Sequence, residues 1–570
     1  MSDTPAVVVV SGHMVDTPDR SGPPRFPPKQ VDRVSDEVAH VMSEWGVGPG
    51  TTIVSGGARG ADIIVAEAGV ARGATVKLCL ALPPNEFERR SVALPDSDWS
   101  ARFRALLQIA DVETVSKQDS PDDDGEVFAQ ANRRLIEVAR VIDPTPHAVL
   151  VWNGEGGDGA GGTRDFVRQL GYDAPNRRVC VIDPTPRDYE ARQTTPGPKK
   201  LLALDGGGIR GVLCLEILKS IETQLREVEG KSVGLSDYFD YFGGTSTGAI
   251  IATALALGRP VDDVLDEYQT LARRVFTKRL IPMRLRSIYR DSGLTAQLDS
   301  FLGRGRSLGD ADFKSLLALV LHNTVTDSPW PLSNCTQAKY NRADRNLLPV
   351  PDRNLDLSLT TLVRGSTAAP VYFSPQELRV GARDFLFQDG GLTPFNNPAM
   401  MLVLLATLPE YGLRWPVGEQ NMLVVSVGTG SAAGTHPGLK ANKVTLLFTA
   451  QNLPSVFMRG ASVGQDLICR ALGTTKAGAE IDREVGSRVN RSAISTPSLF
   501  SYVRYDADLS DEALIRHGIR SRRTRQRVRK LDAVDEMGSL RDIGKRVGSD
   551  VDVLQHFRGF LGHDDAKSSR

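Results

Sequence analysis

Cysteine is scarce in this sequence. The five cysteines among the 570 residues are Cys79, Cys180, Cys214, Cys335 and Cys469. No two of them stand at a CxxC or other metal-ligand spacing, which argues against the common zinc motifs and against a disulfide framework. A few scattered cysteines are typical of small core residues in a reducing compartment. We therefore expect no metal site and no other cofactor.

Long apolar runs and an excess of one charge are also absent. The longest apolar stretch, near residues 399–409, is far shorter than a membrane span. The N-terminus has no basic segment, and its apolar run is too short for a signal peptide. Lys and Arg number 69, as do Asp and Glu, so the charge gives no reason to expect nucleic acid as a partner. We expect a cytoplasmic protein whose contact with the inner face of the membrane is peripheral.

The N-terminal part of the chain alternates strand-like and helix-like segments. Short β-branched apolar runs, typical of strands in a parallel sheet, occur at residues 6–12, 51–57, 75–83, 147–154 and 177–183. Helical patterns lie between them, at residues 31–46 and 61–73. This alternation predicts a doubly wound, Rossmann-like α/β domain over residues 1–185. We interpret the hexapeptide VIDPTP, at 141–146 and again at 181–186, as two similar strand ends.

The composition changes twice further along the chain. A polar, Pro-rich segment predicts a linker over residues 186–199, and a second α/β region follows over residues 200–508. Residues 509–570 are charged and helical in pattern, which predicts a C-terminal extension. Within it, residues 516–530 hold eight Lys and Arg residues. That basic run is either a solvated helix face or a segment that binds anionic lipid electrostatically.

One serine in the second region stands in a nucleophile motif. Gly244, Ser246 and Gly248 fit the G-x-S-x-G elbow, in which a sharp strand-to-helix turn raises a hydroxyl clear of the sheet. An apolar, helix-like stretch follows directly. Because a serine hydroxyl is a poor nucleophile until a base takes its proton, the motif requires a partner elsewhere in the chain.

A glycine-rich turn precedes this elbow by about forty residues. Its strand-like segment LLALD leads into Gly206, Gly207, Gly208, Arg210 and Gly211. Such a turn leaves main-chain N–H groups pointing at one spot, which suits an oxyanion hole at the start of a helix. GxGxxG can also bind dinucleotides, but that role requires an acidic residue about 20 positions later at a strand end. Glu222 and Glu227 fall on the helix instead, so we favour the oxyanion hole.

Three motifs in this order, DGGGIRG, GTSTG and DGG, resemble those of the patatin-like phospholipase family. The segments RGSTAAPVYFSP (364–375), NNPA (396–399) and SVGTG (426–430) also resemble that family, so the likeness covers roughly residues 200–430. The resemblance implies a three-layer α/β/α hydrolase domain with a Ser–Asp dyad that needs no histidine. It makes Asp389, in a turn with Gly390 and Gly391, the base for Ser246.

The histidines agree with this assignment. Only His322 falls between the elbow and the DGG turn, and its apolar surroundings favour a structural role. His436 is the alternative partner for a conventional triad. The resemblance instead implies that Ser246 attacks an ester carbonyl, that Asp389 takes its proton, and that water later releases the fatty acid. An ordinary aspartate, with a pKa of about 3.9, is a weak base, so we expect burial to raise the pKa of Asp389.

Glycines and polar residues follow the predicted strands of the N-terminal domain. These loops would gather at the carboxyl ends of the strands, where α/β sheets bind ligands, and the helix start near Ala61 suits a phosphate. The candidate nucleotide-binding residues are Gly12, His13, Arg20, Gly56, Gly57, Arg59, Gly60 and Asp62. Asp62 could hold a ribose hydroxyl or simply cap the helix.

SGGARGAD (55–62) and VLVWNGEGGDGAGGTRDFV (149–167) resemble the SLOG superfamily of nucleotide-sensing, Rossmann-like domains. Relatives that cleave nucleotides carry PGGxGTxxE in the later loop. In this sequence the leading proline is missing, and Phe166 stands at the position of the glutamate. The resemblance therefore implies that the domain binds a nucleotide without cleaving it. A domain used only for assembly is the alternative.

A nucleotide sensor joined to a lipase resembles bacterial anti-phage effectors. We expect a phospholipase that degrades membrane phospholipids when its N-terminal domain binds a nucleotide second messenger, and a homo-oligomer that rearranges on activation. One alternative is a constitutive lipid acyl hydrolase whose N-terminal domain serves only as a docking domain. The other is a nucleotide-binding scaffold without catalysis.

Overall fold

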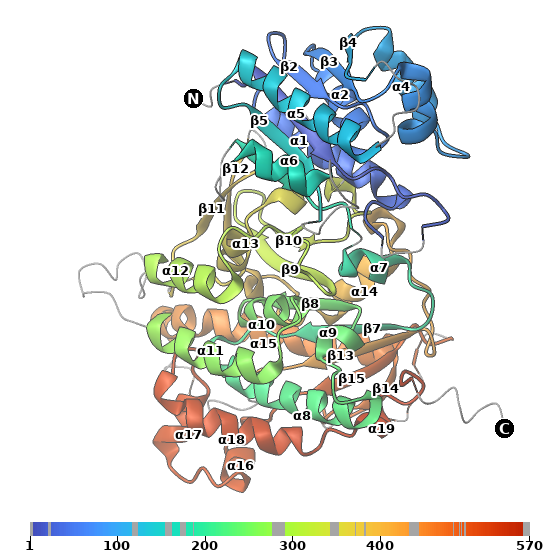
Figure 1. Ribbon diagram of the computed structural model, residues 1–570. Coiled ribbons are helices and arrows are strands. Elements are labelled where there is room, and N and C mark those ends of the chain that lie inside the picture. Colours follow the sequence, from blue (N-terminus) through green and yellow to red (C-terminus); the bar gives the residue numbers. More distant parts are fainter. Residues whose placement is uncertain are drawn as a thin grey trace, which may run out of the picture. The chain divides into compact units, whose positions relative to one another are not determined.

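The computed structural model describes residues 4–20, 24–116, 124–153, 162–171, 178–185, 187–275, 291–341, 353–370, 372–380, 383–431, 440, 444–482, 484–489, 491, 493–494 and 497–562. These residues fall into two compact units that divide between residues 186 and 187. Figure 1 labels the helices and strands of both units.

Unit 1 is built on a six-stranded sheet whose paired strands all run parallel, in the order β4-β3-β2-β1-β5-β6. Its strands are β1 (Val7–Gly12), β2 (Thr52–Ser55), β3 (Thr75–Leu80), β4 (Asp111–Thr114), β5 (His147–Val151) and β6 (Val179–Ile182). The strand order reverses between β1 and β5. In open α/β sheets, ligands bind beside the carboxyl ends of the strands at such a switch point.

Helices cover both faces of this sheet. They are α1 (Val31–Glu44), α2 (Ala61–Val70), α3 (Pro84–Phe87), α4 (Trp99–Leu107), α5 (Asp124–Ile142) and α6 (Thr163–Leu170). One apolar cluster holds the buried side chains of α1, α2 and α4, and a second holds those of α6 and of the second half of α5. The α/β fold with a parallel sheet that the sequence predicts is therefore confirmed for this unit.

Two features of unit 1 differ from the sequence-based expectations. Strand β4 has no apolar run, because it lies at the sheet edge and all four of its residues are at least partly exposed. The first VIDPTP copy ends helix α5, whereas the second ends strand β6, so only the second is a strand end. What the copies share is the turn that follows: the Thr145 and Thr185 N–H groups each donate to the aspartate two residues earlier, at 2.8 Å.

Unit 2 contains a nine-stranded mixed sheet in the order β11-β12-β9-β8-β7-β13-β15-β14, with β10 paired to β9. Its strands are β7 (Lys199–Leu204), β8 (Tyr241–Thr245), β9 (Leu316–Asn323), β10 (Ser328–Ser333), β11 (Gln376–Val380), β12 (Arg383–Asp389), β13 (Met422–Val427), β14 (Thr474–Ala477) and β15 (Ser501–Tyr505). The central pairs are parallel, whereas β10, β11 and β12 join antiparallel to their neighbours.

The helices of unit 2 form layers on the two faces of this sheet (Figure 1). They are α7 (Asp188–Thr194), α8 (Gly211–Glu229), α9 (Leu235–Tyr238), α10 (Thr247–Ala256), α11 (Val261–Val275), α12 (Asp291–Leu302), α13 (Leu359–Ser366), α14 (Ala399–Thr407), α15 (Leu446–Leu472), α16 (Asp511–Arg516), α17 (Arg522–Val528), α18 (Met537–Gly548) and α19 (Val553–His556). Helices α8 and α10 contact each other and the sheet, and α14 contacts the sheet together with α15. One large apolar core joins these layers.

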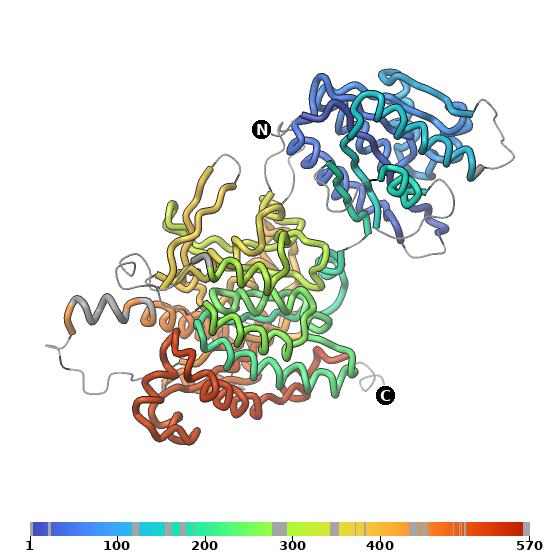
Figure 2. Tube along the Cα trace, turned by 60° about the vertical axis from the view of Figure 1, so that its left-hand side comes forward, coloured from blue at the N-terminus to red at the C-terminus, as the bar shows by residue number. Residues whose placement is uncertain are grey.

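The segments at both ends of unit 2 pack into that core. Where the sequence predicts a linker over residues 186–199, the structure has helix α7, and Tyr189 is fully buried in the core cluster of unit 2. Helix α18 lies directly on α8, since a Cβ at Gly544 would come within 2.6 Å of the Leu213 carbonyl oxygen. Arg541 of α18 also pairs with the buried Glu216 of α8 at 2.5 Å. Figure 2 shows these C-terminal helices, in red, alongside α8.

Candidate active site

Strand register brings the elbow serine and the DGG aspartate to the same place. Strand β8 pairs with β9 so that Thr245 lies opposite Val320. Strand β12 pairs with β9 from the other side, with Asp389 opposite Leu321. Adjacent residues of β9 therefore hold the end of β8 and the end of β12. Ser246, which follows Thr245, is thereby set beside Asp389.

The turn at Ser246 has the geometry of a nucleophile elbow. Ser246 has φ 55° and ψ −123°, a left-handed conformation that strains a residue with a side chain, and helix α10 begins at the next residue. The turn is tight enough to require glycine on both sides. A Cβ at Gly244 would lie 2.2 Å from the Gly248 carbonyl oxygen, and a Cβ at Gly248 would lie 2.1 Å from the Leu204 carbonyl oxygen.

Ser246 and Asp389 share a short hydrogen bond. The Ser246 hydroxyl donates to Asp389 Oδ2 at 2.6 Å, and the Gly391 N–H donates to Asp389 Oδ1 at 2.7 Å. Both side chains are buried. Burial raises the pKa of Asp389 to about 6, although the two hydrogen bonds act in the opposite direction. A carboxylate with this pKa is ionised at neutral pH and is a stronger base than an ordinary aspartate.

Ser366, at the end of α13, supports the elbow from behind. Its hydroxyl accepts from the Ser246 N–H at 3.0 Å and donates to the Val320 carbonyl oxygen at 2.7 Å. It therefore connects the nucleophile to the strand that sets the register. Although Ser366 lies within the segment RGSTAAPVYFSP, no role was predicted for it from the sequence. A serine near a helix end gives no local signal for such a contact.

No histidine lies among the residues that line the pocket at Ser246, within the part of the chain that the structure describes. His322 instead has its Nε2 atom 3.1 Å from Oδ1 of the exposed Asp327. His436 lies outside the described residues. Asp389 is thus the titratable group that contacts the Ser246 hydroxyl.

The glycine-rich turn lies next to this pair, and two of its N–H groups are available. The Gly206 N–H donates to the Asn396 carbonyl oxygen at 3.1 Å, and the Gly211 N–H is taken up by the turn itself. In the described part of the chain, the Gly207 and Gly208 N–H groups donate to no protein acceptor. Gly208 also lines the pocket together with Ser246. Of these two amides, that of Gly208 therefore belongs to a residue at the pocket.

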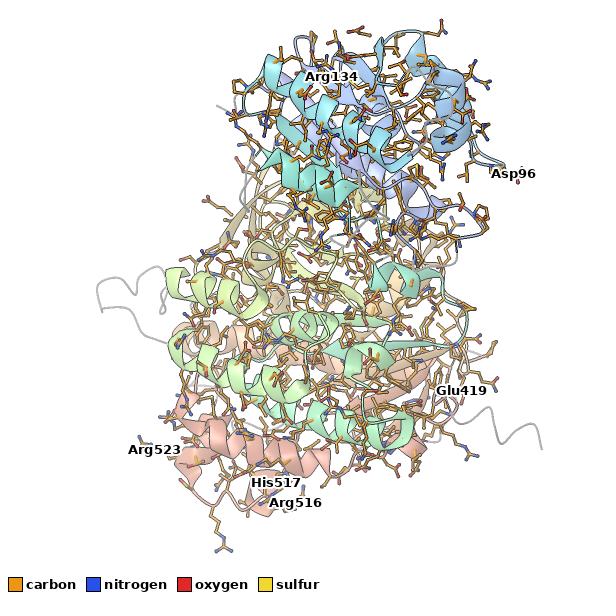
Figure 3. All side chains as sticks on the ribbon, in the orientation of Figure 1. Asp96, Arg134, Glu419, Arg516, His517 and Arg523 are labelled. Atoms are coloured by element: carbon orange, nitrogen blue, oxygen red, sulfur yellow. The ribbon has the colours of Figure 1, made fainter. Side chains whose placement is uncertain are left out.

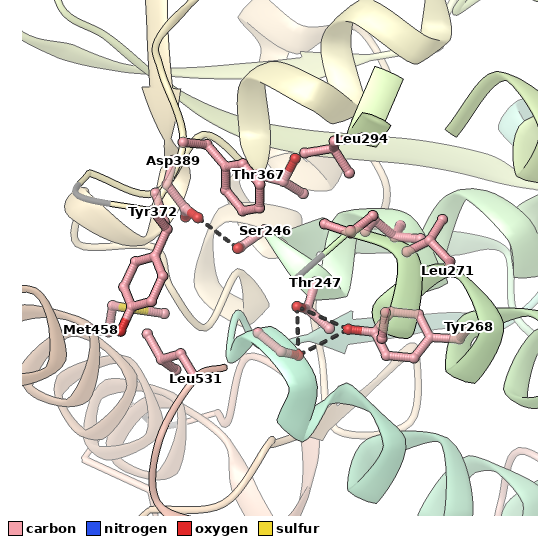
Figure 4. Close-up of a pocket in the computed structure, with 16 residues that line it drawn as sticks. Ser246, Thr247, Tyr268, Leu271, Leu294, Thr367, Tyr372, Asp389, Met458 and Leu531 are labelled. Atoms are coloured by element: carbon pink, nitrogen blue, oxygen red, sulfur yellow. Dashed lines mark hydrogen bonds between the residues drawn. The ribbon is translucent and has the colours of Figure 1, made fainter. Parts of the chain in front are cut away.

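Contacts from three elements hold this turn in place. The Gly208 carbonyl oxygen accepts from the hydroxyls of Thr247 and Tyr268, both at 2.9 Å (Figure 4). The Ile209 N–H donates to the Leu531 carbonyl oxygen at 2.8 Å. Gly208 has φ 57°, and a Cβ there would come within 2.3 Å of that same oxygen. The turn is therefore fixed before any substrate arrives.

Arg210 braces the turn from within. Its Nε atom donates to the Gly207 carbonyl oxygen at 3.3 Å, and its Nη1 atom donates to the Gly430 carbonyl oxygen at 3.0 Å. Burial lowers the pKa of Arg210, and the nearby carboxylates of Asp506 and Asp205 partly offset this. Arg210 does not line the pocket at Ser246, so the structure favours a bracing role there.

An apolar pocket opens in front of Ser246 and Asp389. It holds about 580 Å³ of empty space, counted to its open mouth. Its lining is mostly hydrocarbon and includes Ile250, Leu271, Leu294, Phe373, Met458 and Leu531. Figure 4 shows Ser246 and Asp389 meeting at this pocket, with Met458 and Leu531 on one side and Leu271 and Leu294 on the other. Such a site suits a hydrocarbon chain attached to an ester.

Unit 1 has a larger cavity at the carboxyl ends of β1, β2 and β3. It holds about 1470 Å³ of empty space, counted to its open mouth, and is lined by residues from the loops after these strands and from α5. Of the eight candidate nucleotide-binding residues, the lining includes Gly12, His13, Gly56 and Asp62. His13 Nε2 lies 2.8 Å from Asn153 Oδ1, and burial is the largest cause that lowers the pKa of His13.

The other four candidates have different positions. Arg59 is buried, with its Nε atom donating to the Val15 carbonyl oxygen at 3.0 Å, and Arg20 pairs with Asp16 at 3.5 Å. Gly57 and Gly60 shape the loop without lining the cavity. Four lining residues with suitable chemistry were not predicted from the sequence, namely Arg25, Arg90, Phe87 and Phe128. They come from segments with no glycine motif to mark them.

Asp62 contributes to the loop as well as to the cavity. Its Oδ2 atom accepts from the Ala58 N–H at 3.2 Å, so the carboxylate supports the turn ahead of α2. Burial raises the pKa of Asp62 to about 7 against this hydrogen bond. The Ala61 N–H at the start of α2 already donates to the His13 carbonyl oxygen, at 3.3 Å. The part of the later loop at residues 154–161 lies outside the described residues.

Among the described residues, no group of three or more His, Cys, Asp or Glu side chains could hold a metal ion. All five cysteines are free, and four of them are buried.

Comparison with known proteins gives a family for part of the chain. Residues 202–403 match the family model described as patatin-like phospholipase. Patatin-like protein 1 of Arabidopsis thaliana is 30% identical over 258 residues, covering 40% of this chain and 58% of that protein. A protein of Escherichia coli named cGAMP-activated phospholipase is 28% identical over 251 residues, covering 43% of this chain and 66% of that protein. The chain thus spans less than two thirds of the length of these relatives.

Solved structures give weaker matches. VipD from Legionella pneumophila matches with a TM-score of 0.25 and 14% identity, covering 61% of this chain and 67% of that chain. Human GIVD cytosolic phospholipase A2 matches with a TM-score of 0.27 and 15% identity, covering 67% of this chain and 61% of that chain.

Proposed function

We propose that this protein is a lipid acyl hydrolase that cleaves phospholipid esters with a Ser246–Asp389 dyad. The observation that carries the proposal is the 2.6 Å hydrogen bond from a strained elbow serine to a buried carboxylate, at an apolar pocket. The relatives named as patatin-like proteins and phospholipases support the substrate class. No histidine is required, because the carboxylate itself contacts the nucleophile.

The steps follow from the positions of these atoms. Ser246 Oγ attacks the ester carbonyl carbon while Asp389 Oδ2 takes its proton. The amides of Gly207 and Gly208 stabilise the oxyanion, and Asp389 then gives the proton to the departing alcohol. A water molecule, deprotonated by Asp389, attacks the acyl-enzyme. Asp389 then returns that proton to Ser246 Oγ as the fatty acid leaves, which regenerates both residues. The apolar pocket holds the acyl chain throughout.

A fluorophosphonate probe and a fatty-acid assay test this proposal. We expect the intact protein to gain one probe adduct on Ser246, and Ser246→Ala to gain none. Asp389→Asn should lower the rate of fatty-acid release from phosphatidylcholine vesicles by roughly a hundred- to ten-thousandfold. Ser549→Ala, at an exposed position after α18, is the matched control and should behave as the parent. Equal activity of Ser246→Ala and the parent would exclude the dyad and leave the non-catalytic scaffold.

We further propose that unit 1 is a SLOG-like domain that binds a nucleotide second messenger and thereby activates the hydrolase. The cavity at the switch point of its sheet supports this, because it offers two arginines for phosphates and two phenylalanine rings for a base. A relative is named a cGAMP-activated phospholipase, which supports activation by a nucleotide. In this proposal the protein acts against membranes of the infected cell, as bacterial anti-phage effectors do.

Blocking the cavity separates this activation from constitutive hydrolysis. Asn132→Trp on α5 fills the cavity, whereas Gln130→Trp places the same side chain on an exposed position of the same helix. We expect cGAMP or a mononucleotide from a tested panel to raise the rate of fatty-acid release by the parent and by Gln130→Trp, but not by Asn132→Trp. A rate that no nucleotide changes would favour a constitutive hydrolase with a docking domain.

A further inference from the structure

Helix α15 exposes an apolar stripe along most of its described length. The stripe consists of two groups on one side of the helix, the first being Leu453, Val456 and Phe457 and the second, ten residues later, being Leu467 and Ile468. Val456 is 63% exposed and Phe457 is 55% exposed. Large apolar side chains at this exposure lose free energy to water unless something covers them. We call this set the α15 stripe.

The opposite side of the same helix faces the active site. Met458 is buried and lines the pocket that contains Ser246 and Asp389. Ser462 is also buried and donates to Asp205, directly ahead of the glycine-rich turn. The α15 stripe therefore lies on the outer side of the helix whose inner side closes the acyl pocket. A hydrocarbon surface in contact with the stripe would be one helix diameter from the catalytic pair.

Unpaired cations gather on the C-terminal segment of unit 2. Residues 508–530 carry eight Arg and Lys side chains against three Asp and Glu side chains. Arg525, Arg527 and Arg529 form ion pairs. In the described part of the chain, five exposed side chains form none, and we call these the cation cluster: Arg516, Arg520, Arg522, Arg523 and Lys530. Figure 3 shows Arg516 and Arg523 pointing outward from the C-terminal helices.

One end of the cation cluster comes close to the stripe beside the active site, because Lys530 stands between Arg529 and Leu531. A polar hollow next to the acyl pocket is lined by Val456 and Arg459 of α15 together with Arg529 and Leu531, which follow α17. Leu531 and Met458 line both this hollow and the acyl pocket. Figures 1 and 2 both show α15 next to the red C-terminal helices. Apolar and cationic side chains thus border a hollow that adjoins the acyl pocket.

We propose that the α15 stripe and the cation cluster together form the surface by which the protein docks on an anionic phospholipid bilayer. This inference rests on the proposed function, because it gives the lipid hydrolase a way to place its pocket against its substrate. Exposed apolar side chains enter the interface, and the cations lie against the negative headgroups. None of the described helices is long and apolar enough to cross a membrane, so this contact is interfacial.

Charge distinguishes a membrane from a second copy of the chain as the occupant. In a two-fold pair, the same patch faces itself, so pairing across the α15 stripe would bring two cation clusters toward one interface. Like charges at close range oppose such a contact. An anionic bilayer instead neutralises all five cations of the cluster. The stripe adds hydrocarbon to that attraction, as in other helices that lie at a membrane surface.

Vesicle flotation of the full-length Ser246→Ala protein tests the surface without hydrolysing the lipid. We expect it to bind phosphatidylcholine vesicles that contain phosphatidylglycerol, and to bind vesicles of phosphatidylcholine alone much more weakly. Arg522→Gln with Arg523→Gln should weaken binding about 25-fold, since each basic residue near an anionic surface contributes roughly fivefold. Val456→Ser with Phe457→Ser should weaken it roughly tenfold or more. High salt should weaken binding of the parent.

Matched controls sit elsewhere on unit 2. Leu554→Ser, at an exposed apolar position of α19, should bind as the parent does, and so should Arg304→Gln with Lys231→Gln, at exposed cations that form no ion pair within the described residues. Unchanged thermal transitions show that each variant is folded. Full binding by the arginine variant, or parent binding that salt does not weaken, would overturn the proposal. The proposal would also be overturned if Val456→Ser with Phe457→Ser converted an oligomer into a monomer but still bound vesicles. That result would mean that the stripe is covered by a second copy of the chain.

The outcome is independent of the hydrolase assignment. Binding in this experiment is measured on a protein that lacks Ser246. Loss of vesicle binding in both variants, together with absent probe labelling of the unmutated protein, would keep the docking surface and reject the dyad. Probe labelling of the unmutated protein, together with unaltered vesicle binding by the arginine and the stripe variants, would keep the dyad and reject the docking surface.

Discussion

The Arg504 guanidinium forms a bidentate ion pair with the Asp205 carboxylate. Its Nη1 atom donates to Oδ1 at 2.8 Å, and its Nη2 atom donates to Oδ2 at 2.7 Å. Both side chains are buried. Asp205 immediately precedes the glycine-rich turn, and Arg504 belongs to β15, about three hundred residues later. Ser462 also donates to Asp205 Oδ2, at 3.0 Å, and accepts from the Asn396 side chain at 2.9 Å. This buried network holds the base of the glycine-rich turn, which lies next to Ser246.

Removing one charge of this pair should be costly. We expect Arg504→Gln to lower the free energy of unfolding by about 3 to 5 kcal/mol, because it leaves the Asp205 charge buried without its partner. The double variant Asp205→Asn with Arg504→Gln should recover part of that loss, since no unpaired charge remains. Urea unfolding measures both. Lys476→Gln, which breaks a partly exposed pair with Glu419, is the control and should cost about 1 kcal/mol or less.

The rate of acyl release should follow the ionisation of Asp389. Its pKa is about 6, and only the ionised carboxylate can take the proton from Ser246. We expect kcat/KM for a monomeric ester to be constant above neutral pH and to fall about tenfold per pH unit well below pH 6. Protein that has been incubated at low pH and returned to pH 7.5 should regain full activity, which distinguishes titration of Asp389 from unfolding. A half-maximal rate near pH 4 would contradict the assignment of Asp389 as the base.

The same raised pKa predicts a stability effect. An unfolded aspartate titrates near pH 3.9, so a folded pKa near 6 means that the folded state binds this proton more tightly. The stabilisation from protonation is complete below the unfolded pKa and is lost as the pH rises through 6. Asp389→Asn should therefore raise the free energy of unfolding by about 3 kcal/mol at pH 8 and by about half of that at pH 5. A gain that is equal at both pH values would show that Asp389 titrates alike in both states.

Gly208 should not tolerate a methyl group. Its φ is 57°, and an added Cβ would lie 2.3 Å from the Leu531 carbonyl oxygen, so backbone strain and a collision combine there. We expect Gly208→Ala to abolish probe labelling of Ser246 and to lower the free energy of unfolding by more than about 2 kcal/mol. Gly230→Ala, at a positive φ with no atom within 4 Å of its Cβ, isolates the strain and should keep full labelling. Labelling of Gly208→Ala at the parent rate would mean that the turn accommodates the methyl group without moving its amides.

Local patterns in the sequence predicted much of the site. Ser246 between glycines indicates an elbow because no other residue fits where Gly244 and Gly248 pack. The glycine-rich turn could be recognised for the same reason, and the parallel strands of unit 1 follow from their β-branched runs. Strand β4 was not predicted, because an exposed edge strand needs no apolar run. The roles of Ser366, Asn396 and Arg504 were also not predicted, because the sequence around a polar residue does not indicate which distant atom it will contact in the fold.

The sequence motifs, together with their resemblance to the patatin-like family, thus indicated the candidate groups: a hydroxyl between two glycines, a carboxylate before two glycines, and a glycine-rich turn. Tertiary structure decided which of them meet. A hydrogen bond forms only where two strands share the register of a third, and β9 supplies that register by pairing Val320 with Thr245 and Leu321 with Asp389. The raised pKa of Asp389, the free amides of Gly207 and Gly208, and the exposed side of α15 likewise arise from burial and neighbours, which only folding creates.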